Sequence, residues 1–284
     1  MTELAVRAGR VDGLVGELAK LPAFLRRDLL VAWSYRFAFV GDLFNLAAQT
    51  LTFYFVGQMV DPSKLPVYGG TQATYLEFVA IGIGVSAFLL FGLGRVAQAV
   101  RGEQLMGTLE SVLMTPTASP TVQIGSVFFD LIYIPIRTAL FLLVVAVAFG
   151  LNFHAEGIVP AALVLLVFIP FVWGLGVLVA ALTLTFKRGM GAVGLGALAL
   201  GIFSGAYFPL SLLPHWLASV AADNPIARAM DAIRTALLSN AGWAGIASDL
   251  ALLAPLSALS LAIGLFAFKL ALMRERRLGT LGLY

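Results

Sequence analysis

Residues 37–60 read FAFVGDLFNLAAQTLTFYFVGQMV and form the first of several apolar runs that are long enough to cross a lipid bilayer. A helix of this length measures roughly 36 Å at about 1.5 Å per residue, which exceeds the hydrocarbon core of about 30 Å. The sequence therefore predicts an all-α integral membrane protein with six transmembrane helices. The five further predicted spans are residues 75–98, 121–150, 158–186, 191–209 and 246–272.

The composition also indicates a membrane protein. Hydrophobic residues make up 60% of the chain and charged residues only 12%, whereas soluble proteins carry about 25% charged residues. The chain contains no cysteine, which excludes disulfides and thiolate metal sites. Its two histidines, His154 and His215, stand far apart, so we expect no metal site, and the net charge of +3 gives no reason to expect nucleic-acid binding.

Residues 1–36 differ from the apolar runs. The first 20 mix acidic and basic side chains and lack the apolar core of a signal peptide, so we expect a cytoplasmic leader. From Leu21 onward the segment carries three arginines and Trp33, which predicts an interfacial helix. The six-span domain then covers 37–273, and 274–284 form a cytoplasmic tail.

Lysine and arginine predict the orientation, because cytoplasmic segments of membrane proteins are enriched in both. With both termini inside the cell, 14 of the 18 lie in predicted cytoplasmic segments. Lys64, Arg228 and Arg234 lie on the outer side, and Arg137 lies within a span. We therefore expect a multi-pass protein of the plasma membrane with cytoplasmic termini.

Residues 204–240 are apolar but interrupted by three prolines, and the pieces 214–222 and 226–239 are too short to cross a membrane. An apolar stripe at helical spacing runs through the second piece, formed by Ile226, Met230, Ile233 and Leu237. These features predict two short re-entrant helices that dip into the outer leaflet before the last span. The alternative is an ordinary extracellular loop.

The stretch EQLMGTLESVLMTP at 103–116 interrupts the apolar runs with charge. Its apolar side chains recur on one helical face, at Leu105, Leu109, Val112 and Leu113. The opposite face carries Glu103, Gly107 and Glu110. The pattern predicts a short amphipathic helix in the first cytoplasmic loop, and a solvated connector without a partner is the alternative.

Polar residues inside the spans are candidates for a translocation path, since they are costly in lipid and usually face protein or water. Asp42, Asn45 and Gln49 form a stripe on the first span. This stripe is expected to face a dimer seam or a cavity within it. In the alternative interpretation Asp42 is interfacial and its neighbours make structural hydrogen bonds.

The third span adds Asp130 and Arg137, seven residues apart on one face. Arg137 lies near mid-span, where an unpaired cation costs at least about 2.5 kcal/mol, so it requires a partner or water. Asp130 is about 10 Å away along the helix axis, which is far for direct pairing. The candidates for the partner of Arg137 are therefore Glu77, Asp249 or a cavity. A structural ion pair and a contact with substrate fit the pattern equally well.

Two stretches resemble a known family. Glu103-Gln-Leu-Met-Gly-Thr-Leu-Glu110, followed by Thr115-Pro116, is similar to the E..GTLE.LL.TP signature of ABC-2 type transporter permeases. The stretch YFPLSLLPHWL at 207–217 resembles the YFP..LLP.WL element of that family, and Asn224-Pro225 follows it. The resemblance covers about residues 21–275 and is closest to exporters of drugs and natural products.

The resemblance implies a bacterial permease that works as a dimer, with a second copy or a paralogue, among membrane lipids. Two copies of a cytoplasmic ABC ATPase would hold ATP and Mg²⁺, and no cofactor is expected on this chain. Residues 101–116 would form the coupling helix that inserts into the ATPase, and the outer short helices would close the exit. The residues implied for ATPase coupling are Arg101, Glu103, Gly107, Thr108, Leu109 and Glu110. The residues implied for the outer gate are Tyr207, Phe208, Pro209 and Trp216.

The chain has no nucleotide site of its own in its sequence. A G-x-x-x-x-G-K-[ST] phosphate loop is absent. Residues 189–194 match G-x-G-x-x-G, but they open an apolar run with no strand before it, so we interpret them as helix packing. Gly201-x-x-x-Gly205 is likewise interpreted as a small-residue contact face. We therefore expect no catalytic residue here and ATP hydrolysis on a separate subunit.

The predicted function is an ATP-driven exporter permease that moves an amphiphilic drug, natural product or lipid by alternating access. An exporter of polysaccharide or lipid-linked glycan is the nearest alternative. A secondary transporter independent of an ATPase is another, although the sequence shows no convincing internal repeat. An intramembrane enzyme is disfavoured because no cluster of His, Asp and Glu is visible.

Overall fold

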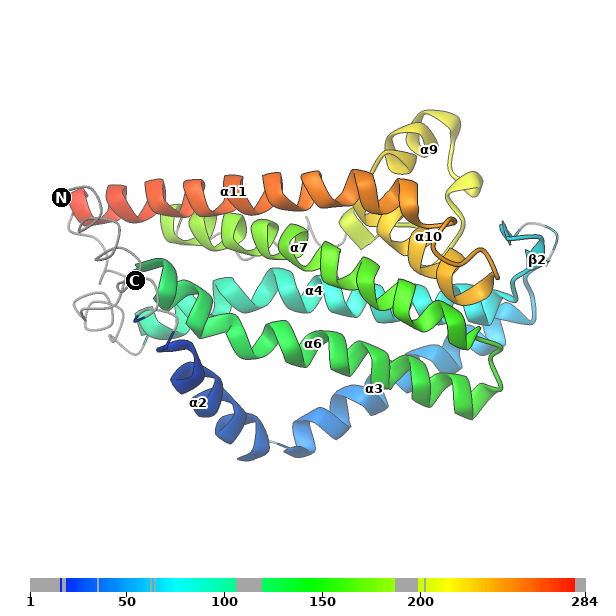
Figure 1. Ribbon diagram of the computed structural model, residues 1–284, viewed down its shortest axis with the longest axis horizontal. Helices are drawn as coiled ribbons and strands as arrows, with labels where there is room; N and C mark the ends of the chain where they lie inside the picture. The colour runs from blue at the N-terminus through cyan, green and yellow to red at the C-terminus, as the bar shows by residue number, and fades with distance from the viewer. Residues whose placement is uncertain are drawn as a thin grey trace, which may run out of the picture.

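Four long helices lie side by side along the long axis of the molecule (Figure 1). They are α4 (Tyr75–Leu105), α6 (Ser119–Phe149), α7 (Ile158–Phe186) and α11 (Ala247–Leu278). The computed structural model describes residues 16, 19–34, 36–61, 63, 65–105, 119–186, 199–201 and 203–278. Within this bundle α6 runs opposite to α4 and α7 (Figure 1).

Length and apolar composition allow four of the described helices to cross a membrane. The four segments are Tyr75–Arg95, Phe128–Phe149, Ala155–Thr185 and Ala247–Glu275. They coincide with four of the six predicted runs, which confirms the all-α membrane class. Of the predicted run 191–209, residues 191–198 and 202 lie outside the described part of the chain. The described remainder is helical at 199–201 and 203, and the chain leaves the helix from Ser204 onward.

Two further helices precede the bundle. α2 (Leu21–Ser34) packs on α6, where Gly125 leaves room for the ring of Phe24. α2 exposes several large apolar side chains, as an interfacial helix does: Leu29, Leu30, Val31 and Trp33. α3 (Arg36–Gly57) forms a helix over the first predicted run and lies obliquely against the bundle (Figure 1). α3 is not among the four segments above, because its mean hydropathy is lowered by Asp42, Asn45 and Gln49.

The predicted outer segment forms two short helices, α9 (His215–Ala222) and α10 (Pro225–Leu238), after the single turn η3 (Leu210–Leu212). Asn224 caps α10, because its side-chain oxygen accepts a hydrogen bond from the amide of Ile226 at 3.0 Å, and Pro225 follows at the first helical position. The predicted stripe of α10 is buried against α4 and α7: Ile226, Met230, Ile233 and Leu237. α10 is therefore part of the packed core.

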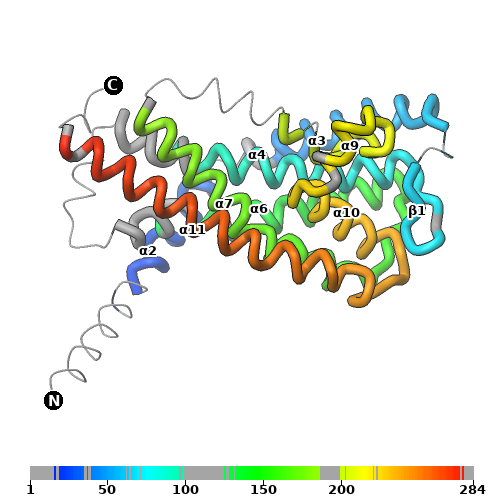
Figure 2. The backbone as a smooth tube through the Cα atoms, turned by 90° about the horizontal axis from the view of Figure 1, so that it is seen from above, coloured from blue at the N-terminus to red at the C-terminus, as the bar shows by residue number. Residues whose placement is uncertain are grey.

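A hairpin of two short strands lies at the same end of the molecule as α9 and α10 (Figure 2). β1 (Val67–Tyr68) pairs antiparallel with β2 (Thr71–Gln72). The turn between them needs positive φ at two successive residues, 57° at Gly69 and 84° at Gly70, and glycine adopts this conformation without strain.

α7 and α11 pack closely against each other. A Cβ on Gly174 or on Gly264 would overlap the backbone of the other helix, and the Ser260 hydroxyl donates to the Phe171 carbonyl at 3.0 Å. The contact face predicted at Gly201 and Gly205 has no partner helix among the described residues. A Cβ on Gly201 would meet no described atom within 4 Å, while Gly205 has φ of 67° and turns the chain.

Candidate functional site

A cavity of about 230 Å³ lies between α3, α4 and α6. Its polar wall comes from three helices: Asp42, Asn45 and Gln49 of α3, Ser86 of α4 and Arg137 of α6. Its apolar wall is formed by Leu46, Ile83, Ala87, Leu90 and Phe91, and Tyr207 adds a ring. Ser86 and Arg137 lie near the middle of the segments Tyr75–Arg95 and Phe128–Phe149, so the cavity is at mid-depth.

The predicted polar stripe of α3 lies on this cavity. Asp42, Asn45 and Gln49 all line it, as the spacing of about one helical turn requires. The side chain of Asp42 is 44% exposed, so the cavity reaches the surface of this chain at that point.

Arg137 is buried at the cavity wall, with its side chain only 5% exposed. One Nη lies 3.7 Å from a carboxylate oxygen of Asp42, which is an ion contact longer than a hydrogen bond. The guanidinium carbon lies 3.9 Å from the centroid of the Phe91 ring. Nε of Arg137 has no hydrogen-bond partner among the described residues. Arg137 is thus held by a ring and a distant carboxylate.

Two of the predicted partners of Arg137 are wrong, and the predicted cavity is present. Glu77 instead caps α4, accepting from the amide of Thr74 at 2.9 Å, and it also accepts from the amide of Asn152 at 3.2 Å. Asp249 faces Arg228 at 3.7 Å. The cap at Thr74 follows the T-x-x-E spacing of a capping box. The contacts of Glu77 with Asn152 and of Asp249 with Arg228 join different elements and do not follow from sequence spacing.

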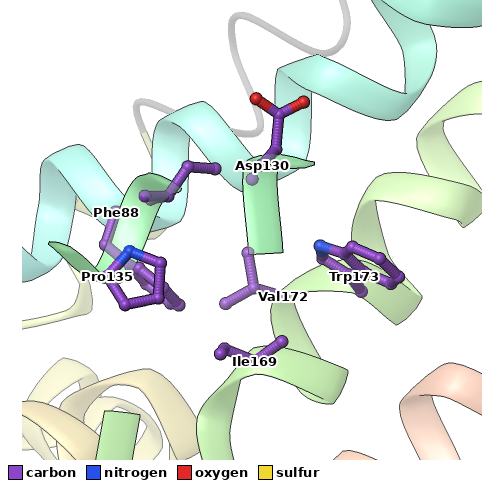
Figure 3. Close-up of a pocket in the computed structure, with 8 residues that line it drawn as sticks. Phe88, Asp130, Pro135, Ile169, Val172 and Trp173 are labelled. Carbon is purple, nitrogen blue, oxygen red and sulfur yellow. The ribbon is translucent and has the colours of Figure 1, made fainter. Parts of the chain in front are cut away.

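Asp130, the remaining candidate of the third span, does not line the cavity of Arg137. Its carboxylate accepts a hydrogen bond from Nε of Arg95 at 2.9 Å and so ties α6 to α4. Asp130 borders a separate space of about 10 Å³ with Phe88, Pro135 and Trp173, and its carboxylate points away from that space (Figure 3). A space of this size holds at most a water molecule, so we assign Asp130 a structural role.

Of the outer gate candidates, Tyr207 alone lines the cavity. Its carbonyl accepts a hydrogen bond from the Tyr75 hydroxyl at 3.0 Å, and its ring stacks on Phe53 with centroids 5.3 Å apart. Phe208 is half-buried and Pro209 is buried. Trp216 lies on α9 with 69% of its surface exposed. The structure therefore joins Tyr207 to the polar stripe and leaves Trp216 on the surface.

Arg234 of α10 is buried, although it is not one of the four apolar residues of the predicted stripe. It donates to the carbonyls of Phe78, Gly205 and Ala206, at 2.9 Å to Gly205, and pairs with Asp231 at 3.3 Å. Its guanidinium carbon also lies 3.5 Å from the centroid of the Phe78 ring. The helical wheel could not reveal this, because alanines on the flanks of α10 are buried as well and only the packed neighbours supply the carbonyls.

The predicted coupling residues lie at the limit of the described chain. Arg101 and Glu103 belong to the last turns of α4, which continues without a break to Leu105. Gly107, Thr108, Leu109 and Glu110 lie outside the described residues. Within the described part of the chain, no group of three His, Cys, Asp or Glu residues could hold a metal ion.

The comparison with protein families decides the class of the chain. The family model described as ABC-2 type transporter matches residues 20–238, which run from the start of α2 to the end of α10. The chain belongs to this family. The match includes the segment with Glu103 and Glu110, the cavity and the outer helices. No curated protein matches this permease significantly.

Proposed function

We propose that this permease is the membrane subunit of an ATP-driven exporter that moves an amphiphilic drug, natural product or lipid by alternating access. Two copies, or one copy and a paralogue, would assemble with two cytoplasmic ABC ATPase subunits that bind ATP and Mg²⁺. The family supports the transporter class. The polar cavity at mid-depth supports a transport path, because polar groups in such a position normally face a partner, water or a substrate.

We assign the cytoplasmic side to the end of the bundle where α4 and α11 terminate. That end carries Lys269, Arg274 and Arg277 on α11. Such an excess of positive charge marks cytoplasmic ends. At the opposite end Trp216 and Trp243 are exposed, as expected for tryptophans at a membrane interface. This orientation, six spans and cytoplasmic termini form one consistent topology.

α4 supplies a mechanical link between the coupling segment and the cavity. Its span ends near Arg95, yet the helix continues to Leu105. Ten residues of helix measure about 15 Å, so α4 projects well beyond the span. The same helix carries Ser86 and Phe91 at the cavity. A push on Glu103 would therefore be transmitted along a continuous helix to the cavity wall.

Two other functions remain in competition. An exporter of polysaccharide or lipid-linked glycan uses the same architecture, but a cavity of about 230 Å³ with one polar and one apolar wall favours a smaller amphiphile. A secondary transporter would run on an ion gradient without an ATPase, and the family match disfavours it.

Charge reversal at the coupling segment tests the proposed function. We expect the double variant Glu103→Lys/Glu110→Lys to lose at least about tenfold in substrate-stimulated ATPase activity of the permease–ATPase complex, because lysines in place of two carboxylates that face the ATPase would turn attraction into repulsion. ATP-dependent uptake into inside-out vesicles should fall in parallel, while membrane insertion stays normal.

The matched control is Glu156→Lys, which reverses an exposed charge in the turn η2 (Ala155–Gly157). This turn precedes α7 at the end of the bundle away from the coupling segment. This variant should behave like the wild type. Full coupling in the double variant, or transport that continues without any ATPase subunit, would contradict the proposal.

A further inference from the structure

The cavity between α3, α4 and α6 contains two buried polar atoms that no described residue satisfies. They are Nε of Arg137 and Oγ of Ser86. Both residues are only 4% exposed, and both line the cavity. Buried polar atoms of folded proteins are nearly always hydrogen-bonded. Two unsatisfied buried atoms in residues that line one cavity therefore indicate that another molecule completes the site.

Arg234 shows how this chain satisfies a buried arginine that has a structural role. Its nitrogens donate to three backbone carbonyls and to the carboxylate of Asp231. Arg137 is buried to a similar degree and stacks on an aromatic ring in the same way, but it makes no hydrogen bond within the described part of the chain. The two arginines differ in what their N–H groups face. Those of Arg234 face backbone carbonyls and a carboxylate, and Arg137 lines a cavity.

The surroundings of Arg137 leave its charge available. The ring of Phe91 covers a face of the guanidinium and cannot replace an acceptor in the plane of the N–H groups. Asp42 lies 3.7 Å away, and its side chain is 44% exposed, so it is free to turn toward water. A ligand that brings its own negative oxygen would occupy the position that Asp42 fills incompletely.

We propose that the cavity binds the oxyanion headgroup, phosphate or carboxylate, of an amphiphile, with Arg137 as its main donor and Ser86 as its second. This inference rests on the proposed function and names the substrate class of the same site. A planar guanidinium binds an oxyanion through two parallel hydrogen bonds more strongly than it binds a neutral acceptor. The amides of Asn45 and Gln49 supply further donors.

The size of the cavity fits a headgroup. Its volume of about 230 Å³ is below the range of about 300–1,000 Å³ that encloses a drug-sized ligand. The apolar remainder of the amphiphile would therefore lie outside it.

Chain-matched amphiphiles test the headgroup preference. The full-length permease is placed in phosphatidylcholine nanodiscs, and binding of radiolabelled dodecyl phosphate is measured with empty nanodiscs subtracted. Unlabelled dodecyl phosphate, dodecyl maltoside and dodecyltrimethylammonium then compete. We expect dodecyl phosphate to compete at least about tenfold better than the other two, as a charge-assisted pair with Arg137 predicts. Equal competition by all three, or a preference for the cation, which would assign the cavity to Asp42, overturns the proposal.

Three variants separate the donors from the competing carboxylate. Arg137→Gln should lose at least about tenfold in affinity for dodecyl phosphate and Ser86→Ala about threefold or more, whereas Asp42→Asn should gain. The control Arg228→Gln removes a charge on α10 outside the cavity and should bind like the wild type. Unchanged affinity in a folded Arg137→Gln variant contradicts the proposal. If that variant does not fold, the opposite shifts of Ser86→Ala and Asp42→Asn decide.

Inorganic phosphate identifies the source of the oxyanion. Competition by millimolar phosphate supports a site that recognises the headgroup alone, and its absence supports a site that needs the attached chain. The binding assay requires neither ATP nor an ATPase, so its failure is separable from that of the proposed function. Headgroup selectivity without ATP-driven export would refute only the proposed function, and export without selectivity would refute only this inference.

Discussion

Two buried arginines of this permease carry the same charge and have opposite environments. Arg234 is fixed by three carbonyls and Asp231, and it joins α10 to α4 and to the turn at Gly205. Arg137 has one distant carboxylate and a ring. A buried charge whose hydrogen bonds are all made stabilises one conformation. A buried charge whose hydrogen bonds are incomplete is a candidate for binding a ligand.

Substitution of these arginines should affect stability differently. Arg234→Gln leaves several buried carbonyls unsatisfied and should lower the free energy of unfolding by about 3–5 kcal/mol. Arg137→Gln removes an incompletely paired cation and should stay within about 1 kcal/mol of the wild type. Thermal unfolding in detergent measures both, and Arg228→Gln, at an arginine that is 38% exposed, is the neutral control. Equal losses for the two variants would show that both arginines are structural.

Sequence reasoning at the residue scale succeeded within helices and failed between them. The spacing of Asp42, Asn45 and Gln49 places them on one face of α3, and the structure has all three on one cavity. The pairs Asp42–Arg137 and Arg95–Asp130 depend on how three helices pack. No pattern along the chain encodes that packing.

At the scale of elements, the outer end is assembled from short pieces held by a few polar contacts. The Tyr68 hydroxyl of the hairpin donates to Asp231 of α10 at 3.3 Å. Asp231 in turn pairs with Arg234. The hairpin, α10 and α4 are therefore linked through one network at the end opposite the coupling segment.

This network predicts that the stability of the folded protein declines at alkaline pH. Burial raises the pKa of Tyr68 above its ordinary value, so the folded protein keeps the phenol proton that the unfolded chain releases above pH of about 10. The contribution of Tyr68 to the free energy of unfolding is therefore fully present below about pH 10. Above that pH it falls by up to about 1.4 kcal/mol per pH unit. Unfolding followed across pH 8–11 should show a shallower alkaline decline for Tyr68→Phe than for the wild type. Superimposable pH profiles would count against the linkage.

Most element boundaries are set by local signals, which is why they could be predicted. α7 matches the predicted run 158–186, and α10 begins at the Asn224-Pro225 cap. α4 extends beyond its predicted run of 75–98 because the polar residues after Arg95 continue the helix to Leu105. Hydropathy alone finds the membrane part of a helix and misses such a polar extension.

At the scale of the whole molecule, the proposed function connects one end of the bundle to its middle. α4 joins the Glu103 segment to Ser86, and Ser86 lies with Arg137 on a cavity that Tyr207 borders at its outer side. In the proposed alternating access this cavity would open first to the cytoplasm and then to the exterior. We therefore expect Ser86 to be accessible from the cytoplasm in one state and from the exterior in the other, and to change between them when the ATPase binds ATP.

The chain contains no cysteine, so a single cysteine introduced at Ser86 is the only thiol of the permease. The most direct measurement is labelling of Ser86→Cys by a membrane-impermeant maleimide in vesicles of each orientation, with the ATPase complex nucleotide-free or trapped with ATP and vanadate. Ser257→Cys is the control, because Ser257 is equally enclosed but lies on α11 away from the cavity. We predict that Ser86→Cys is labelled from the cytoplasmic side in the nucleotide-free complex. After trapping, it should be labelled from the outer side and no longer from the cytoplasmic side. Ser257→Cys should not be labelled in either state. Labelling of Ser86→Cys that is absent from both sides, or identical in the two states, would contradict the account.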